Sequence, residues 1–256
     1  MEAGGGEKRR RRVRLLANDM ALLGDNQPAR GRRSTLRSRN GYAAAYRHLR
    51  RVDPIMRELI SHVGPCRLAP RRDYFVTLCD SIISQQLSAQ AAETIFDRFL
   101  ALYPAGRPTP RSVAKTPASV LKTAGVSRQK ARYLKDLAAG FQDGRITPRR
   151  FVRQSNEEII ASLVSIHGIG RWTAEMFLMF SLNRSDVLPV DDLGIRKAVQ
   201  RSYELRNLPV PTRLRKIGQA WHPYETIACW YLWKSLRTRR PREKPATRRQ
   251  ETGEAR

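Results

Sequence analysis

An apolar stretch interrupted by a Gly-Ile-Gly turn constrains the fold of this chain more than any other feature. The segment 163–180 reads LVSIHGIGRWTAEMFLMF, with apolar residues on both sides of Gly168, Ile169 and Gly170. It predicts a helix that ends just before the first glycine, a tight turn, and a second helix that starts near Arg171. Two glycines let the backbone turn sharply and approach a ligand closely, and Ile169 can fill the space between the two helices.

Backbone N–H groups at the start of the second helix would be exposed in such a turn. Those of Gly170, Arg171 and Trp172 would have no acceptor within the helix, and the positive end of a helix favours anions. On a nucleic acid the anion would be a backbone phosphate, bound without reading the base sequence. A simple glycine turn between two buried helices is the alternative interpretation of the same residues.

Helical spacing of apolar residues extends over most of the chain. It covers 42–63, 74–103 with a break at 85–88, 112–121, 127–141, 156–164, 173–182, 192–203, 211–221 and 224–236. No alternating run is long enough to predict a sheet. We therefore expect an all-α body over residues 41–239, with two helical lobes and a cleft between them. Residues 1–40 and 240–256 are expected to be a disordered basic arm and a disordered basic tail.

The charge of the chain favours a polyanionic partner. The net charge is +26, of which residues 1–40 carry +7 and residues 234–256 carry +6, so that +13 remains on the central 193 residues. The predicted body is thus basic in its own right, which is typical of proteins that contact nucleic-acid phosphates. A cationic surface that serves only solubility is the alternative.

Cysteine usage and hydropathy exclude several other classes. Cys66, Cys79 and Cys229 lie far apart and form no C-x-x-C pair, so neither a disulfide framework nor a zinc or iron–sulfur site is expected. No apolar run reaches the ~18 residues that a membrane span needs. We expect no membrane partner, and a cytoplasmic, nucleoid-associated location in a bacterium or a nuclear one in a eukaryote.

A pair of aspartates follows the hairpin and precedes another helix. Asp191 and Asp192 come after Leu-Pro-Val, and Pro189 keeps the preceding chain extended. An aspartate in this place is often only an N-cap of the following helix. Two adjacent aspartates allow two roles, one as a cap and one facing a cleft.

Three motifs, in this order and spacing, resemble the helix–hairpin–helix DNA glycosylase superfamily. They are SQQLS at 84–88, the hairpin at 163–180 and VDDL at 190–193, and the similarity extends from about Asp53 to Leu236. Within the superfamily the chain looks most like the 3-methyladenine DNA glycosylase II family. The resemblance implies that Asp192 is the catalytic carboxylate, which leaves Asp191 as a helix cap or as a group that supports Asp192 from behind. Residues 1–50 are too short and polar for the N-terminal β-domain of larger relatives.

The resemblance also implies the reaction subtype and the substrate. Bifunctional members carry a lysine just after the glycine turn, whereas this chain has Trp172 there. We therefore expect a monofunctional enzyme for base excision repair, which flips out alkylated purines of the 3-methyladenine and 7-methylguanine type and hydrolyses them off to leave an abasic site. A glycosylase for deaminated bases such as hypoxanthine or uracil, and a non-catalytic DNA-binding module, are the alternatives.

The remaining site residues follow from matching the motifs. The expected roles are a base pocket of Trp172, Met176 and Trp233, a DNA wedge of Gln86 and Leu87, and phosphate contacts from Gly168, Gly170, Arg171 and Thr173. Met176 stands where some relatives carry a tyrosine. Backbone carbonyls of Val164, Ile166 and Ile169 match a site for a structural Na⁺ or K⁺, and no cofactor is expected to be required. The expected partner is double-stranded DNA with damaged bases, bound by a monomer.

Overall fold

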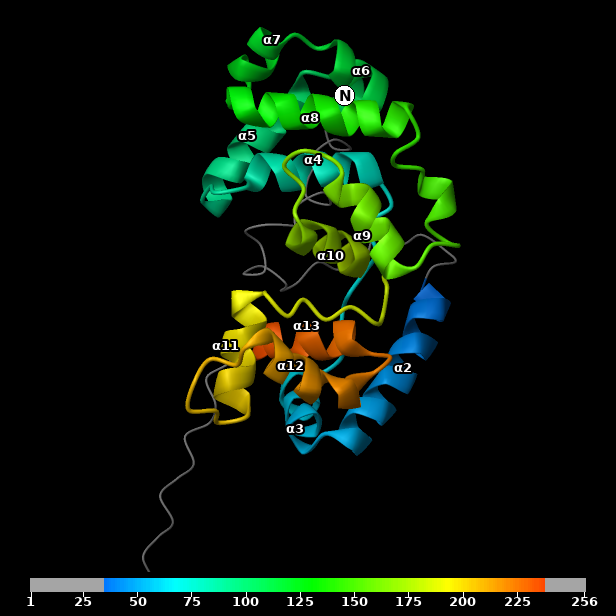
Figure 1. The fold of residues 1–256 in the computed structure, drawn as a ribbon, viewed down its shortest axis with the longest axis vertical. Helices are drawn as coiled ribbons and strands as arrows, with labels where there is room; N and C mark the ends of the chain where they lie inside the picture. Colours follow the sequence, from blue (N-terminus) through cyan, green and yellow to red (C-terminus); the bar gives the residue numbers. More distant parts are fainter. Residues whose placement is uncertain (1–34, 238–256) are drawn as a thin grey trace, which may run out of the picture.

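In the computed structural model, which describes residues 35–237, the chain forms two helical lobes stacked one above the other (Figure 1). The upper lobe holds α4 (Tyr74–Ser84), α5 (Ala89–Ala101), α6 (Pro110–Lys115), α7 (Ala118–Thr123), α8 (Arg128–Gln142), α9 (Asn156–Val164) and α10 (Arg171–Phe180). The lower lobe holds α2 (Thr35–Val52), α3 (Pro54–Val63), α11 (Leu193–Ser202), α12 (Pro211–Gly218) and α13 (Glu225–Ser235). Short 3₁₀ turns lie at Pro104–Gly106, Pro148–Arg150 and Gln219–Trp221.

The helical prediction is confirmed, since residues 35–237 contain no strand. The break expected at 85–88 is present between α4 and α5. The run 42–63, however, is two helices, because Pro54 opens α3 and its ring nitrogen cannot donate to the preceding turn. Helix α2 begins at Thr35, inside the segment 1–40 expected to be a disordered arm, so that boundary was placed too late. The rest of the arm and the tail 240–256 lie outside the described residues.

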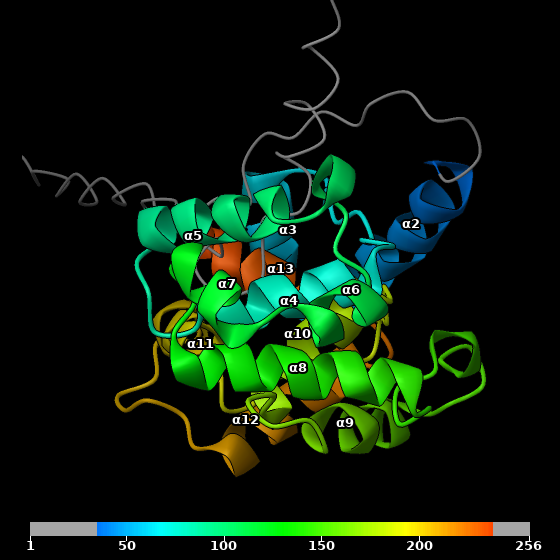
Figure 2. The same ribbon diagram turned by 90° about the horizontal axis from the view of Figure 1, so that it is seen from above.

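Three helices with no polar face form the centre of the molecule. Nearly every residue of α4, α10 and α13 is buried, which is the pattern of a helix enclosed by others. Helix α4 packs on α5 and α8, α10 packs on α9, and α13 packs on α3 and α11. Seen from above, α8 runs across the upper lobe beside α4, on which it packs (Figure 2). No described helix is long and apolar enough to cross a membrane.

The chain passes between the lobes in two segments, 64–73 and 181–192. The second is anchored on α13, where Thr226 Oγ1 donates to the Arg184 carbonyl at 2.7 Å and Thr226 N donates to that of Ser185 at 2.9 Å. Arg184 Nη2 in turn donates to the carbonyls of Phe151 and Gln154 in the upper lobe. This connector is therefore held by both lobes before it reaches Asp192.

A buried aspartate holds the lower lobe together. Asp53 caps α3 by accepting from Ile55 N and Met56 N at 2.9 and 3.1 Å. Its second oxygen accepts from Trp221 Nε1 at 2.8 Å and from the Tyr203 hydroxyl. A buried carboxylate is tolerated only with such partners. The Asp53 carboxylate thereby joins α3 to the end of α11 and to the 3₁₀ turn that follows α12.

Replacing Asp53 by alanine should therefore destabilise the protein far more than the loss of an ordinary cap. The change removes the cap and leaves the buried Tyr203 hydroxyl and Trp221 indole without an acceptor, which should cost about 3–5 kcal/mol in urea unfolding. Asp73→Ala is the matched control, because Asp73 is an exposed cap of α4 and should cost about 1 kcal/mol. Equal losses in the two variants would contradict this role of Asp53.

Candidate active site

Asp192 lies where the two lobes meet, held by N–H groups from three elements. Its Oδ1 accepts from Ile195 N at 2.7 Å and from Trp233 Nε1 at 3.0 Å, and its Oδ2 accepts from Trp172 Nε1 at 2.8 Å. The residue is 7% exposed. Three N–H donors and the positive end of α11 stabilise a negative charge here.

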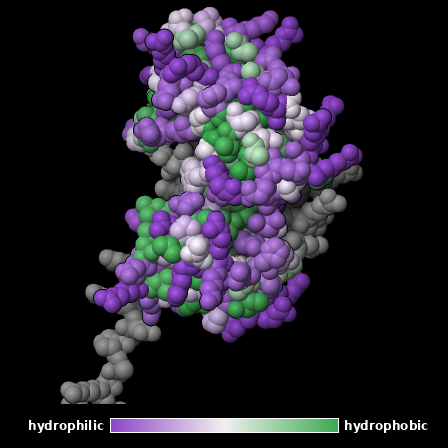
Figure 3. All heavy atoms as spheres, viewed as in Figure 1, coloured by the Kyte–Doolittle hydropathy of each residue, from purple (hydrophilic) through white to green (hydrophobic). Residues whose placement is uncertain are grey.

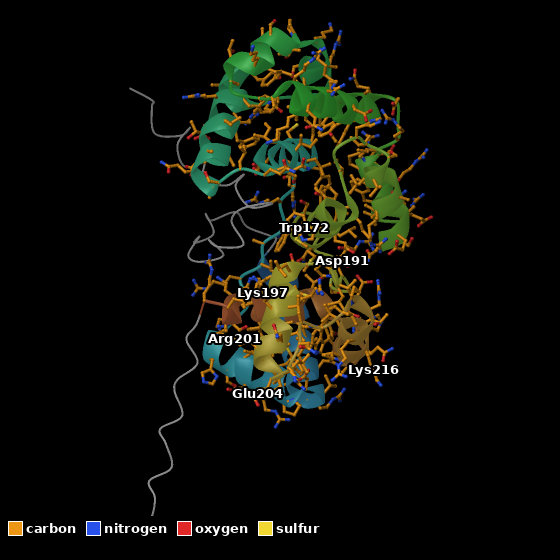
Figure 4. All side chains as sticks on the ribbon, turned by 60° about the vertical axis from the view of Figure 1, so that its left-hand side comes forward. Trp172, Asp191, Lys197, Arg201, Glu204 and Lys216 are labelled. Atoms are coloured by element: carbon orange, nitrogen blue, oxygen red, sulfur yellow. The ribbon has the colours of Figure 1, made fainter. Side chains whose placement is uncertain are left out.

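The donors come from both lobes. Trp172 is half-buried in the first turn of upper-lobe α10, whereas Trp233 is buried in lower-lobe α13. Figure 4 shows Trp172 and Asp191 close to the junction of the lobes, with Lys197 and Arg201 further along α11. Trp172 and Trp233, predicted as walls of the base pocket, are therefore brought together with Asp192, although the three residues are distant in sequence.

Of the two roles expected for Asp191, the structure rules out that of a cap for α11. Asp191 is exposed and does not cap α11, while Asp192 is itself the N-cap. The cap leaves Oδ2 of Asp192 bound only to the Trp172 indole among the described contacts. One side chain therefore does both jobs, and capping fixes the orientation of the carboxylate.

Gly194 is a site residue that the sequence analysis missed. A Cβ at this position would lie 3.0 Å from Asp192 Oδ1 and 3.2 Å from the Trp233 ring. Any side chain there would press on the two groups that define the site. A glycine in the first turn of a helix, where it costs stability, was the available signal.

The Gly-Ile-Gly turn has the predicted hairpin form. Helix α9 ends at Val164, earlier than expected, and α10 begins at Arg171. Gly168 has a φ of 86°, and a Cβ there would lie 2.2 Å from the Tyr133 ring, so only glycine fits. Ile169 is 3% exposed and fills the space between the helices, as predicted. Gly170 caps α10 with no side-chain acceptor, which leaves the first N–H groups of α10 for an anion.

Of the residues predicted to contact phosphate, Arg171 has a side chain that forms ion pairs within the hairpin, and Thr173 is buried. The Arg171 guanidinium donates to Glu157 of α9, with Nη1 at 3.0 Å from Oε2, and to Glu175 of α10, with Nε at 3.1 Å from Oε1. Thr173 is 7% exposed. Arg171 thus clamps the two hairpin helices, and the predicted contact of the turn with phosphate stays a prediction for its backbone N–H groups.

The predicted wedge residues lie at the break between α4 and α5. Gln86 is exposed and Leu87 is half-buried, while Ser88 caps α5 through Ala91 N. The neighbouring Gln85 donates from Nε2 to the Gly168 carbonyl at 2.6 Å. The structure therefore places the wedge loop, residues 85–88, directly beside the hairpin.

Two members of the predicted base pocket present almost no surface. Met176 is 0% exposed and Trp233 is 3% exposed. Met176 belongs to the core, because its position in the buried part of α10 points it inward. Trp172 remains the half-buried aromatic ring beside Asp192. The face drawn in Figure 3 is mostly hydrophilic, with hydrophobic patches on both lobes.

Glu175 is a buried carboxyl group near the site that sequence reasoning did not single out. Burial raises its pKa to about 7, the negative charges of Asp191 and Glu157 act in the same direction, and Arg171 opposes them. The residue lies one turn after Trp172 on α10. The protonation of Glu175 is therefore coupled to its ion pair with Arg171, which helps to hold the two hairpin helices together.

A comparison with protein families identifies the superfamily to which the fold belongs. The model of the HhH-GPD superfamily of base excision DNA repair proteins matches residues 79–223, a range that includes the wedge loop, the hairpin and Asp192. The chain belongs to this superfamily. The resemblance seen in the sequence motifs is confirmed.

Named relatives place the chain among the DNA-3-methyladenine glycosylases. DNA-3-methyladenine glycosylase 1 of Schizosaccharomyces pombe is 38% identical over 193 residues, which cover 73% of this chain and 85% of the relative. A solved S. pombe 3-methyladenine DNA glycosylase in complex with abasic DNA has a TM-score of 0.67 at 36% identity, covering 76% of this chain and 97% of that one. A DNA-3-methyladenine glycosidase structure from Bacillus halodurans has a TM-score of 0.70 at 34% identity, covering 75% and 88%.

Replacing Glu175 by glutamine should change how stability depends on pH. Because the folded state holds this proton more tightly than the unfolded chain, Glu175 contributes stability that is full below pH 4.5 and is lost as the pH rises through about 7. Glutamine cannot ionise, so the unfolding free energy of the variant minus that of wild type should rise from about pH 5 to pH 8 in urea titrations.

Glu158→Gln is the control for this titration. Glu158 is exposed, and hydrogen bonds from the Ser155 N–H and hydroxyl lower its pKa, so its contribution does not change over that range. A flat difference for Glu175→Gln, parallel to that for Glu158→Gln, would contradict a raised pKa at Glu175.

Proposed function

We propose that this protein is a monofunctional DNA glycosylase that flips an alkylated purine out of double-stranded DNA and hydrolyses its N-glycosidic bond. The observation that carries the proposal is the Asp192 carboxylate, fixed by the Trp172 and Trp233 indoles and the Ile195 N–H at the junction of the lobes. A glycosylase must reach its target outside the base stack, and the wedge loop and hairpin lie on the lobe that contributes Trp172.

The chemistry requires a fixed anion next to the sugar. Breaking the bond between base and sugar develops positive charge on the sugar ring, and a preorganised carboxylate stabilises that charge. The same carboxylate can orient the attacking water or accept its proton. Asp192 suits this role because its hydrogen bonds hold it in place before the substrate arrives.

The aromatic residue at the site favours alkylated purines. An indole stacks on any base and attracts a cationic one through its π face, and N-alkylated purines such as 3-methyladenine and 7-methylguanine carry a positive charge. Trp172 is the half-buried ring in position to do this. The S. pombe 3-methyladenine DNA glycosylase supports the choice both by its name and by its structure with abasic DNA, the product of base release.

The hairpin offers a place for a monovalent cation, and we propose that Na⁺ or K⁺ binds there. The carbonyls of Val164 and Ile166 lie at the C-terminal end of α9, where the helix dipole favours positive charge. The Ile166 carbonyl accepts from Ile169 N at 3.1 Å, which leaves its second lone pair for an ion. The Ile169 carbonyl would be the third oxygen ligand.

We also propose that the protein acts as a monomer.

Replacing Asp192 by asparagine should abolish most excision while leaving DNA binding. Asparagine keeps the volume and the N-cap but not the charge, so the single-turnover release of 7-methylguanine from a duplex should fall on the order of 10²–10³-fold. Affinity for a duplex with an abasic-site analogue should be retained. Asp191→Asn, at the exposed neighbour, is the matched control and should excise normally.

Three outcomes of this experiment would count against the proposal. Wild-type excision by Asp192→Asn would remove the catalytic assignment. Release of hypoxanthine or uracil, without any alkylated purine, would identify a glycosylase for deaminated bases. Binding of the wild-type protein to lesion DNA with no release of any base would identify a DNA-binding module.

The product should be an intact abasic strand. Trp172 occupies the position at which bifunctional relatives carry a lysine, so this position offers no amine to form a Schiff base with the sugar. On denaturing gels the strand should break only after alkali treatment, and borohydride should trap no covalent complex. A trapped complex or cleavage without alkali would show a lyase activity instead.

A further inference from the structure

Lys130 of α8 is directed inward, onto the end of α4. Its Nζ donates to the carbonyls of Ile83 and Gln85, each at 2.7 Å. The last carbonyls of a helix have no partner within it, and a cation there is favoured by the helix dipole. Lys130 therefore caps α4 at the point where the wedge loop leaves it.

The same loop is tied to the hairpin by its first residue. Gln85 Nε2 donates to the Gly168 carbonyl at 2.6 Å, while the Gln85 carbonyl accepts from Lys130. Residue 85 is thus fixed through both its side chain and its backbone. One contact holds it against the phosphate-binding turn, and the other holds it against α8.

The residue that follows adopts a backbone conformation that needs such support. Gln86 has a φ of 56°, in the left-handed region that residues with a side chain seldom occupy. Strained conformations of this kind persist where the surrounding contacts enforce them, and they gather at functional sites. Gln86 is exposed, with the fixed Gln85 before it and Ser88, the cap of α5, shortly after it.

One face of α8 supports both the loop and the hairpin. Residues 130, 133 and 136 are spaced three apart and so lie along one side of the helix. Lys130 holds Gln85, the Tyr133 ring lies under Gly168, and Asp136 Oδ2 accepts from His167 N at 2.8 Å and contacts its Nδ1. Two segments about 80 residues apart in sequence are therefore supported by a single helix.

We propose that Lys130 and Gln85 are positioning residues that hold the wedge, Gln86 and Leu87, at a set place relative to the hairpin turn. Phosphate binding at the turn and insertion of the wedge into the base stack then occur in one preorganised geometry. The proposal rests on the glycosylase function above. It makes Lys130 an internal brace and excludes a role for its ammonium group as a phosphate contact.

The test compares Lys130→Met and Gln85→Leu with the matched control Lys135→Met, which removes the same charge from the same helix. One substrate is a duplex with 7-methylguanine, for single-turnover excision at saturating enzyme. The second is a duplex with an abasic-site analogue opposite 2-aminopurine, whose fluorescence reports disruption of the stack. Binding to the second duplex is measured over a range of salt concentrations.

Both brace variants should lose excision and wedge insertion together. We expect the rate to fall roughly ten- to a hundredfold, as for a displaced reacting geometry, and the 2-aminopurine signal to fall with it. The salt dependence of binding should equal that of wild type. Lys130→Arg should recover most of both signals, the double variant should lose little more than the worse single variant, and Lys135→Met should behave as wild type.

Two results would overturn the proposal. A salt slope reduced by about one in Lys130→Met, with normal 2-aminopurine fluorescence, would identify a phosphate contact. A loss of activity that follows a lowered melting temperature, with no recovery in Lys130→Arg, would identify a general stability effect. The 2-aminopurine duplex has no base to release, so it tests the brace even if the wild-type protein excises nothing.

Discussion

The arrangement of the site depends on the hydrogen bonds that the buried carboxylate of Asp192 accepts. A charge at 7% exposure is tolerated because three N–H groups surround it. These donors belong to α10, α11 and α13, so satisfying one carboxylate fixes the upper lobe against the lower at this point. The hydrogen bonds that make the charge tolerable also fix the orientation that the proposed mechanism requires of it.

The lower lobe uses the same device in a second place, for a different purpose. Asp53 also caps a helix and also accepts an indole N–H, from Trp221, but all its described partners lie within its own lobe. Asp192 receives one donor, Trp172, from the other lobe. This difference in location separates a carboxylate that stabilises the fold from one placed at the junction where substrate would enter.

The upper lobe arranges the hairpin and the wedge loop around α8 and α10. Glycine is required at residue 168 because the Tyr133 ring of α8 leaves no room for a Cβ. Arg171, at the start of α10, donates to Glu157 of α9 and to Glu175 of α10. These contacts hold the two helices together next to the turn. The Arg171 side chain is thus occupied by internal contacts, and the prediction that backbone N–H groups of the turn bind an anion does not depend on it.

The amino-acid sequence by itself determined the helical class, the hairpin, the break at the wedge loop and the absence of a lysine at position 172. These features depend on the spacing of apolar residues, on glycine and proline, and on the identity of one residue, all of which are local properties of the sequence.

Only the tertiary structure decided that Asp192 instead of Asp191 caps α11, that Met176 is enclosed, and that Lys130 is directed at α4. It also decided that the pKa of Glu175 is raised and that Gly194 adjoins the Trp233 ring. The physical reason is that each of these depends on which partner a helix face meets, and helical periodicity specifies a face but not its partner.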